Sequence, residues 1–298
     1  MKIKQYVRPA SLEEAYELNQ KKSARILGGM LWMRLGRGMV QTAVDLSGLG
    51  LDQIVETQEE FSIGSMVTLR TLEQHEGLGR YTQGAMREAV HSIVGVQFRN
   101  LATVGGSIWG RFGFSDVLTL FLALDTWVEL YQGGLVPLAK FAEMKKDNDI
   151  LVRLIVKKRA QKTVYLSFRN TRTDFPVLTC AVCMENGPEA QGYAVIGARP
   201  GRALCFALGR ELSDAAAESR RSTSSARGLQ KDMPAERALS ESVPIESAAS
   251  EKLELAVREL VQKVPMGSNM RASAEYRSHL AEVLIRRGLK KLQEGELS

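Results

Sequence analysis

The stretch from Arg99 to Asp125 constrains the chain most, because it combines a glycine pair with a helix start in a short span. Its centre, residues 103–107, reads T-V-G-G-S. Two glycines allow backbone N–H groups to approach a phosphate without hindrance from a Cβ atom. Ser115 and Asp116 then form an N-cap pair before the apolar run 117–124. This pattern predicts a helix entrance whose carboxylate can hydrogen-bond a ribose or an adenine edge. A plain turn and a simple cap also fit, since short glycine motifs are common.

A second glycine pair, at residues 28–29, follows a helix and a strand. A capping box at Ser11 and Glu14 predicts the start of the helix, and residues 24–27 read as the strand. The four residues after the pair, 30–33, are all apolar. They fit a tight turn with side chains in the core, and they also fit a loop whose backbone amides hold a phosphate.

These motifs resemble those of the FAD-binding subunits of molybdenum hydroxylases, the group that includes xanthine dehydrogenase and carbon monoxide dehydrogenase. The family signature reads R-N-x-A-T-[IV]-G-G-N-I, then S-A-D, then L-L-A-L-D-A. Residues 99–106, 115–116 and 122–125 match it in order. Near the end of the chain, S-A-E-Y-R at residues 273–277 is similar to the family's S-A-x-Y-R, a packing motif. The resemblance extends from Ser11 to Gly288.

The resemblance implies that FAD is bound non-covalently. The family position of Ile93 packs near the flavin ring, that of Leu151 contacts the adenine side, and that of Phe175 lies against the isoalloxazine with the cation of Arg169 nearby. Without the family, the apolar residues among these would be assigned to the core. The cofactor contacts implied by the resemblance are Ile26, Leu27, Gly28, Gly29, Met30, Leu31, Trp32, Ile93, Thr103, Val104, Gly105, Gly106, Ser107, Asp116, Leu151, Arg169 and Phe175.

The chain departs from the family at two places. The family's first loop usually reads A-G-G-T-D-L-L, and Met30, Leu31 and Trp32 stand here where its hydroxyl and acid are expected. Ser107 replaces the usual Asn. Backbone amides can still bind a pyrophosphate at the first loop, because glycine gives access to the main chain. The alternative is a degenerate subunit that keeps the fold for assembly and binds FAD weakly or not at all.

The expected fold is α+β, with a two-part FAD-binding domain of the vanillyl-alcohol-oxidase type and a small C-terminal domain. We place the first domain at 1–160, with parts at about 1–56 and 57–160, and the second at 161–298. Three strands of the second domain, expected at 164–168, 177–184 and 193–198, would form an antiparallel meander with helices around it. A segment at about 215–245, rich in Ser, Ala, Arg and Glu, is predicted to be mobile.

Composition limits the remaining possibilities. The net charge is +6, acidic and basic residues are interspersed, and no stripe of basic and aromatic residues indicates binding of nucleic acid. No apolar run is long enough to span a membrane. The N-terminus lacks the apolar core of a signal peptide, so a cytoplasmic location is expected. Three cysteines are too few for an iron–sulfur cluster, and Cys180 and Cys183 should point to opposite faces of a buried strand. The sequence offers no metal site and no catalytic base.

The resemblance implies electron transfer within an oxidoreductase complex like xanthine dehydrogenase. A large partner subunit would bind molybdopterin and hydroxylate the substrate, and a small one would carry [2Fe–2S] clusters. The FAD of this chain would pass the electrons to NAD+ or another acceptor.

Overall fold

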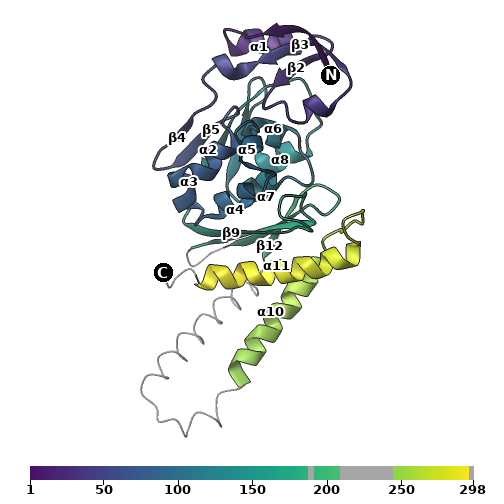
Figure 1. Ribbon diagram of the computed structural model, residues 1–298. Coiled ribbons are helices and arrows are strands. Elements are labelled where there is room, and N and C mark those ends of the chain that lie inside the picture. The colour runs from purple at the N-terminus through teal and green to yellow at the C-terminus, as the bar shows by residue number, and fades with distance from the viewer. Residues whose placement is uncertain (187–190, 209–243, 295–298) are drawn as a thin grey trace.

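The computed structural model describes residues 1–186, 191–208 and 244–294, and within them the strands form three sheets. The sheets follow one another along the molecule, from the purple N-terminal sheet at one end to the layer covered by the yellow helix α11 at the other (Figure 1). No helix in these ranges is long and apolar enough to cross a membrane.

The N-terminal sheet is parallel, with the strand order β1-β3-β2. Ser11 caps the first helix as predicted, since its side chain accepts the backbone N–H of Glu14 at 3.1 Å. The Glu14 carboxylate accepts the N–H of Ala10 at 2.7 Å, one residue before the partner of an ideal capping box. The elements are β1 (Lys2–Val7), α1 (Leu12–Asn19), β2 (Ala24–Leu27), η1 (Met33–Leu35), β3 (Met39–Asp45) and η2 (Leu46–Gly48).

The middle sheet is antiparallel, with the order β4-β5-β8-β6-β7, and six short helices run between its second and third strands in the sequence. Its core includes the fully buried rings of Phe61, Phe121 and Phe141. The elements are β4 (Ile54–Glu56), β5 (Glu60–Gly64), α2 (Leu69–Gln74), α3 (Glu76–Tyr81), α4 (Ala85–His91), α5 (Val96–Arg99), α6 (Val104–Trp109), α7 (Asp116–Leu122), β6 (Thr126–Leu130), β7 (Gly134–Pro137), α8 (Leu138–Glu143) and β8 (Leu151–Lys157).

The C-terminal sheet has four described strands, so the expected number of three is wrong. The order is β12-β11-β10-β9, all antiparallel. The missed strand is a five-residue edge strand, where only every second residue is well covered and the apolar pattern is weak. The elements are β9 (Gln161–Phe168), β10 (Leu178–Glu185), β11 (Gly192–Gly197), β12 (Leu204–Leu208), α10 (Pro244–Gln262) and α11 (Ala274–Glu294).

Helices cover both faces of this sheet, which explains the continuous apolar run in β10. Cys180 packs in the core that faces α10 and α11, and Cys183 packs in the core of the middle layer. The prediction of opposite faces is therefore confirmed. Burial raises the pKa of the Cys180 thiol to about 12 and that of the Cys183 thiol to about 11, so both are structural groups. The segment predicted to be mobile lies outside the described residues, except for its last two, which belong to α10.

Arg277 of the S-A-E-Y-R motif is completely buried and holds the loop before α11. Its guanidinium donates to the carbonyls of Val177, Gly267 and Ala272 at 3.0, 2.8 and 2.6 Å. The motif is thus a packing motif, as expected. It fixes the loop that carries Arg271.

Candidate functional site

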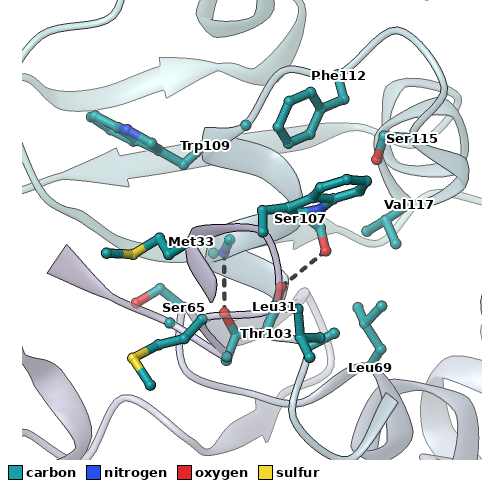
Figure 2. A pocket seen from close by; sticks show the side chains of 18 of the residues that line it. Leu31, Met33, Ser65, Leu69, Thr103, Ser107, Trp109, Phe112, Ser115 and Val117 are labelled. Atoms are coloured by element: carbon teal, nitrogen blue, oxygen red, sulfur yellow. Dashed lines mark hydrogen bonds between the residues drawn. The ribbon is translucent and has the colours of Figure 1, made fainter. Parts of the chain in front are cut away.

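One cavity of about 720 Å³ lies where the three sheets meet, a volume typical of cofactor sites. Its walls come from residues 24–33, 65–69, 93–117, 146–151 and 169–176. Figure 2 shows several of these side chains around it. Of the residues implied as cofactor contacts, all except Val104 line this cavity. Val104 is completely buried in the core, and its N–H donates to the Val67 carbonyl at 2.8 Å.

The first glycine segment, Gly28–Trp32, starts at the carboxyl end of the parallel strand β2, where ligands commonly bind in sheets with parallel strands. Its five backbone N–H groups donate to no atom of the described chain. A Cβ at Gly29 would lie 1.9 Å from the Leu101 carbonyl oxygen, so only glycine fits there. The segment therefore offers a row of free amide donors beside the cavity.

The second segment, residues 103–107, is not the open turn expected from its glycines. It is the start of α6, and its amides are already used. Those of Val104 and Gly105 donate to the carbonyls of Val67 and Ser65, just after β5, and those of Gly106 and Ser107 donate to Thr103. The Ser107 hydroxyl also donates to the Thr103 carbonyl at 3.0 Å (Figure 2). Gly105 is required by packing, because a Cβ there would lie 2.7 Å from the Ser65 carbonyl oxygen. This segment offers hydroxyl groups and space to a ligand.

Asp116 is hydrogen-bonded to two other side chains of the protein. Its carboxylate is 5% exposed and accepts from the Tyr165 hydroxyl and the Arg169 guanidinium, both at 2.5 Å. Burial raises the pKa of the Asp116 carboxyl, and the charge of Arg169 opposes that rise. Asp116 therefore fixes Arg169 in the cavity wall. Tyr165 was missed by the sequence analysis because a tyrosine in a strand gives no motif.

Two buried polar atoms of the cavity wall have no partner in the described chain, the Ser65 hydroxyl and Arg169 Nε. Their side chains are nearly covered, since Ser65 is 4% exposed and the Arg169 side chain 8%. Buried polar groups are normally hydrogen-bonded, so unpartnered ones in a cavity indicate a ligand. Together with the free amides of Gly28–Trp32, they fit an anionic dinucleotide such as FAD.

Four aromatic rings meet at the cavity. The Trp32 indole lies 5.5 Å from the ring of Phe112, 5.7 Å from Phe114 and 5.8 Å from Phe175, measured between ring centroids. Phe175 was expected at the flavin, and the Arg271 guanidinium stands 5.1 Å from its ring centre. Phe112 and Phe114 were missed, although their spacing in R-F-G-F directly before Ser115 could have indicated them.

Among the described residues, no group of three or more His, Cys, Asp or Glu side chains could hold a metal ion.

Comparisons with known proteins identify the family of the chain. Residues 1–158 match the family described as the FAD binding domain in molybdopterin dehydrogenase. The chain belongs to the FAD-binding subunits of the molybdenum hydroxylases. Residues 232–292 match the CO dehydrogenase flavoprotein C-terminal domain. FAD is the cofactor of this family, and the chain is a flavoprotein of the oxidoreductase class.

The chain is similar to known proteins both in sequence and in fold. In sequence, the chain is 27% identical to the uncharacterized Escherichia coli protein YgfM over 186 residues, which cover 61% of this chain and 70% of that protein. In fold, it is similar to carbon monoxide dehydrogenase from Hydrogenophaga pseudoflava, with a TM-score of 0.72, 19% identity and 96% of each chain covered. Quinoline 2-oxidoreductase from Pseudomonas putida 86 gives a TM-score of 0.73 at 20% identity, covering 99% of this chain and 98% of that chain.

Proposed function

We propose that this chain is the electron-transfer subunit of a multi-subunit molybdenum hydroxylase like xanthine dehydrogenase. It would receive electrons from [2Fe–2S] clusters of a small partner subunit and deliver them through FAD to NAD+ or another acceptor. A large partner subunit would bind molybdopterin and the substrate. We also propose that the FAD domain, residues 1–160, is of the vanillyl-alcohol-oxidase type, that FAD is held non-covalently, and that the complex is cytoplasmic.

The observation that carries the proposal is the donor set around one cavity. The free amides of Gly28–Trp32 suit the pyrophosphate, since backbone N–H groups are the usual donors to such an anion. Ser65 and Arg169 supply two further unpartnered polar atoms. When bound, FAD supplies the redox chemistry, while this chain positions it and excludes water.

The absorbance spectrum of the purified chain tests the cofactor, and heat release followed by chromatography identifies it. About one equivalent of released FAD supports the proposal. Co-purification of the tagged chain with a molybdopterin subunit and an iron–sulfur subunit tests the partners. Reduction of the bound FAD by NADH tests the acceptor, and a spectrum that NADH leaves unchanged points to another acceptor.

A degenerate assembly subunit is the second candidate, because the cavity is partly filled by the chain itself. The indole of Trp32 stacks on Phe175, and the four amides of the second segment are already bonded. A colourless chain that takes up no added FAD, yet still assembles with its partner subunits, would favour this candidate.

A further inference from the structure

Three phenylalanine rings form an aromatic slot in the cavity wall, and a ring of the chain itself lies in it. We define the aromatic slot by Phe112, Phe114 and Phe175. Phe114 contacts Phe112 with centroids 5.1 Å apart and Phe175 with centroids 4.6 Å apart. The Trp32 indole contacts all three and is nearly parallel to Phe175, with 24° between the planes. The slot thus holds a flat aromatic group of fused rings.

The loop that carries Phe112 and Phe114 is firmly held. The Gly113 carbonyl accepts the N–H of Ala198 at 2.7 Å, and a Cβ at Gly113 would lie 2.2 Å from the Gly201 carbonyl oxygen. At its base, Arg111 Nε donates to the Phe141 carbonyl at 2.9 Å. This wall of the slot is therefore part of the folded core.

Phe175 is held in a similar way. Its N–H donates to the Asp174 carboxylate at 2.7 Å, and Arg169 donates to the Asp174 carbonyl at 2.6 Å. Arg271 pairs with the same carboxylate at 3.3 Å and covers the Phe175 ring. Both sides of the slot are thus fixed without any help from Trp32.

Trp32 differs from these rings in how it is held. It belongs to the segment whose five amides donate to no described atom, and 45% of its surface is exposed. It can leave the slot without opening the core. Of the four rings, Trp32 is the one that the rest of the structure restrains least.

The spacing leaves no room for another ring beside Trp32. A flat group placed between the indole and Phe175 needs about 7 Å, twice the contact distance of about 3.5 Å between stacked carbon atoms. The two centroids are 5.8 Å apart. A ligand ring that stacks on the face of Phe175 covered by the indole must therefore replace the indole.

We propose that Trp32 is a self-ligand: its indole occupies the aromatic slot that takes the isoalloxazine of FAD, and it leaves the slot when FAD binds. The inference rests on the proposed binding of FAD in this cavity. It predicts that Trp32 competes with the flavin half of the cofactor only. The adenosine and pyrophosphate half binds without meeting the slot.

The test compares FAD with ADP-ribose, which shares the adenosine pyrophosphate and lacks the isoalloxazine. Calorimetric titration of the flavin-free full chain and of Trp32→Ala gives both dissociation constants. We expect Trp32→Ala to bind FAD at least fivefold more tightly and to change the affinity for ADP-ribose less than twofold. Trp127→Phe, which removes an indole outside the cavity, should leave both constants unchanged.

If Trp32→Ala binds FAD as the native chain does, or more weakly, the inference is wrong. An equal change in the affinities for FAD and ADP-ribose also overturns it, because the effect then comes from the backbone of Gly28–Trp32. If neither protein binds FAD or ADP-ribose, the proposed function itself fails.

Fluorescence gives a measurement that does not remove Trp32. In Trp109→Phe/Trp127→Phe, where Trp32 is the sole emitter, FAD should move the emission to longer wavelength and ADP-ribose should not. An emission maximum that FAD leaves in place contradicts the exchange.

Discussion

The two glycine segments of the cavity differ in what their backbones do. In Gly28–Trp32 the amides are free, although the side chains after the glycines depart from the family pattern. In Thr103–Ser107 the residues match the family except at Ser107, yet the amides are used within α6 and in bonds to the segment just after β5. The segment with the better motif is therefore the structural one, and the segment with the poorer motif is the open donor row.

In each segment close packing requires a glycine, but the packing is against a different part of the chain. Gly105 allows α6 to approach the chain at Ser65, and Gly29 allows the first segment to approach Leu101, just before the second. The glycines bring the segments into contact with each other and with the chain just after β5. A glycine pair thus indicates close backbone packing as readily as it indicates a phosphate site.

The largest expected effect comes from Arg99, four residues before the second segment. Arg99 is 5% exposed and binds the Glu73 carboxylate through two nitrogens, at 2.9 and 3.2 Å. Arg99→Met should lower the free energy of unfolding by about 3–5 kcal/mol, because it leaves a buried carboxylate with one fewer cation. Chemical denaturation measures the loss. Arg80→Met, which breaks an exposed pair with Glu76, should cost about 0–1 kcal/mol. Equal losses would show that the buried Arg99–Glu73 pair stabilises the fold no more than an exposed one.

The contact between the two segments gives the next effect. Gly29→Ala places a methyl group against the Leu101 carbonyl, so the backbone must shift. We expect a loss of about 1–3 kcal/mol in the free energy of unfolding, with weaker FAD binding, since overpacking displaces the donor row. Gly38→Ala, where a Cβ meets nothing within 4 Å, is the matched control. A melting temperature that both variants leave unchanged would show that the segments do not need this contact.

The stability of the fold should also depend on pH, because Glu73, the partner of Arg99, titrates. Burial opposes the shift, but hydrogen bonds from Arg99 and Arg70 lower the pKa of the Glu73 carboxyl below its usual value. An acid with a lowered pKa stabilises the fold above its unfolded pKa, and that stability is lost as the pH falls through the folded one. Each unit of lowering is worth about 1.4 kcal/mol.

The difference in unfolding free energy between the native chain and Glu73→Gln should therefore be largest at neutral pH and should narrow below about pH 4.5, the usual Glu value. Denaturation curves of both proteins at several pH values measure it. Curves that stay equally far apart down to pH 3 would show that the charge of Glu73 is not what stabilises the fold.

Much of the fold was predictable where local chemistry decides it. Ser11, Ser115 and the strand Ala24–Leu27 follow from capping and pattern, and the structure has them in place. The edge strand β12 was missed because two of its five residues are exposed and only one is buried. What the amides of a glycine segment bind depends on contacts far along the chain, as Gly105 and Ser65 show. The free Ser65 hydroxyl and the partners of Asp116 are likewise visible only after folding.

The smallest and most selective effect separates the two segments by function. Ser65 lines the cavity and has a buried hydroxyl without a partner in the described chain, whereas Thr103 Oγ1 accepts the Gly106 N–H at 3.1 Å as the cap of α6. Ser65→Ala should weaken FAD binding about fivefold, the value of one hydrogen bond of about 1 kcal/mol, and leave stability unchanged. Thr103→Val should lower the free energy of unfolding by about 1 kcal/mol, because it removes a helix cap. Titration calorimetry and denaturation of both variants measure the two effects. If Thr103→Val instead weakens FAD binding more than Ser65→Ala does and leaves stability intact, the second segment is the ligand site after all, and the division of roles between the segments is reversed.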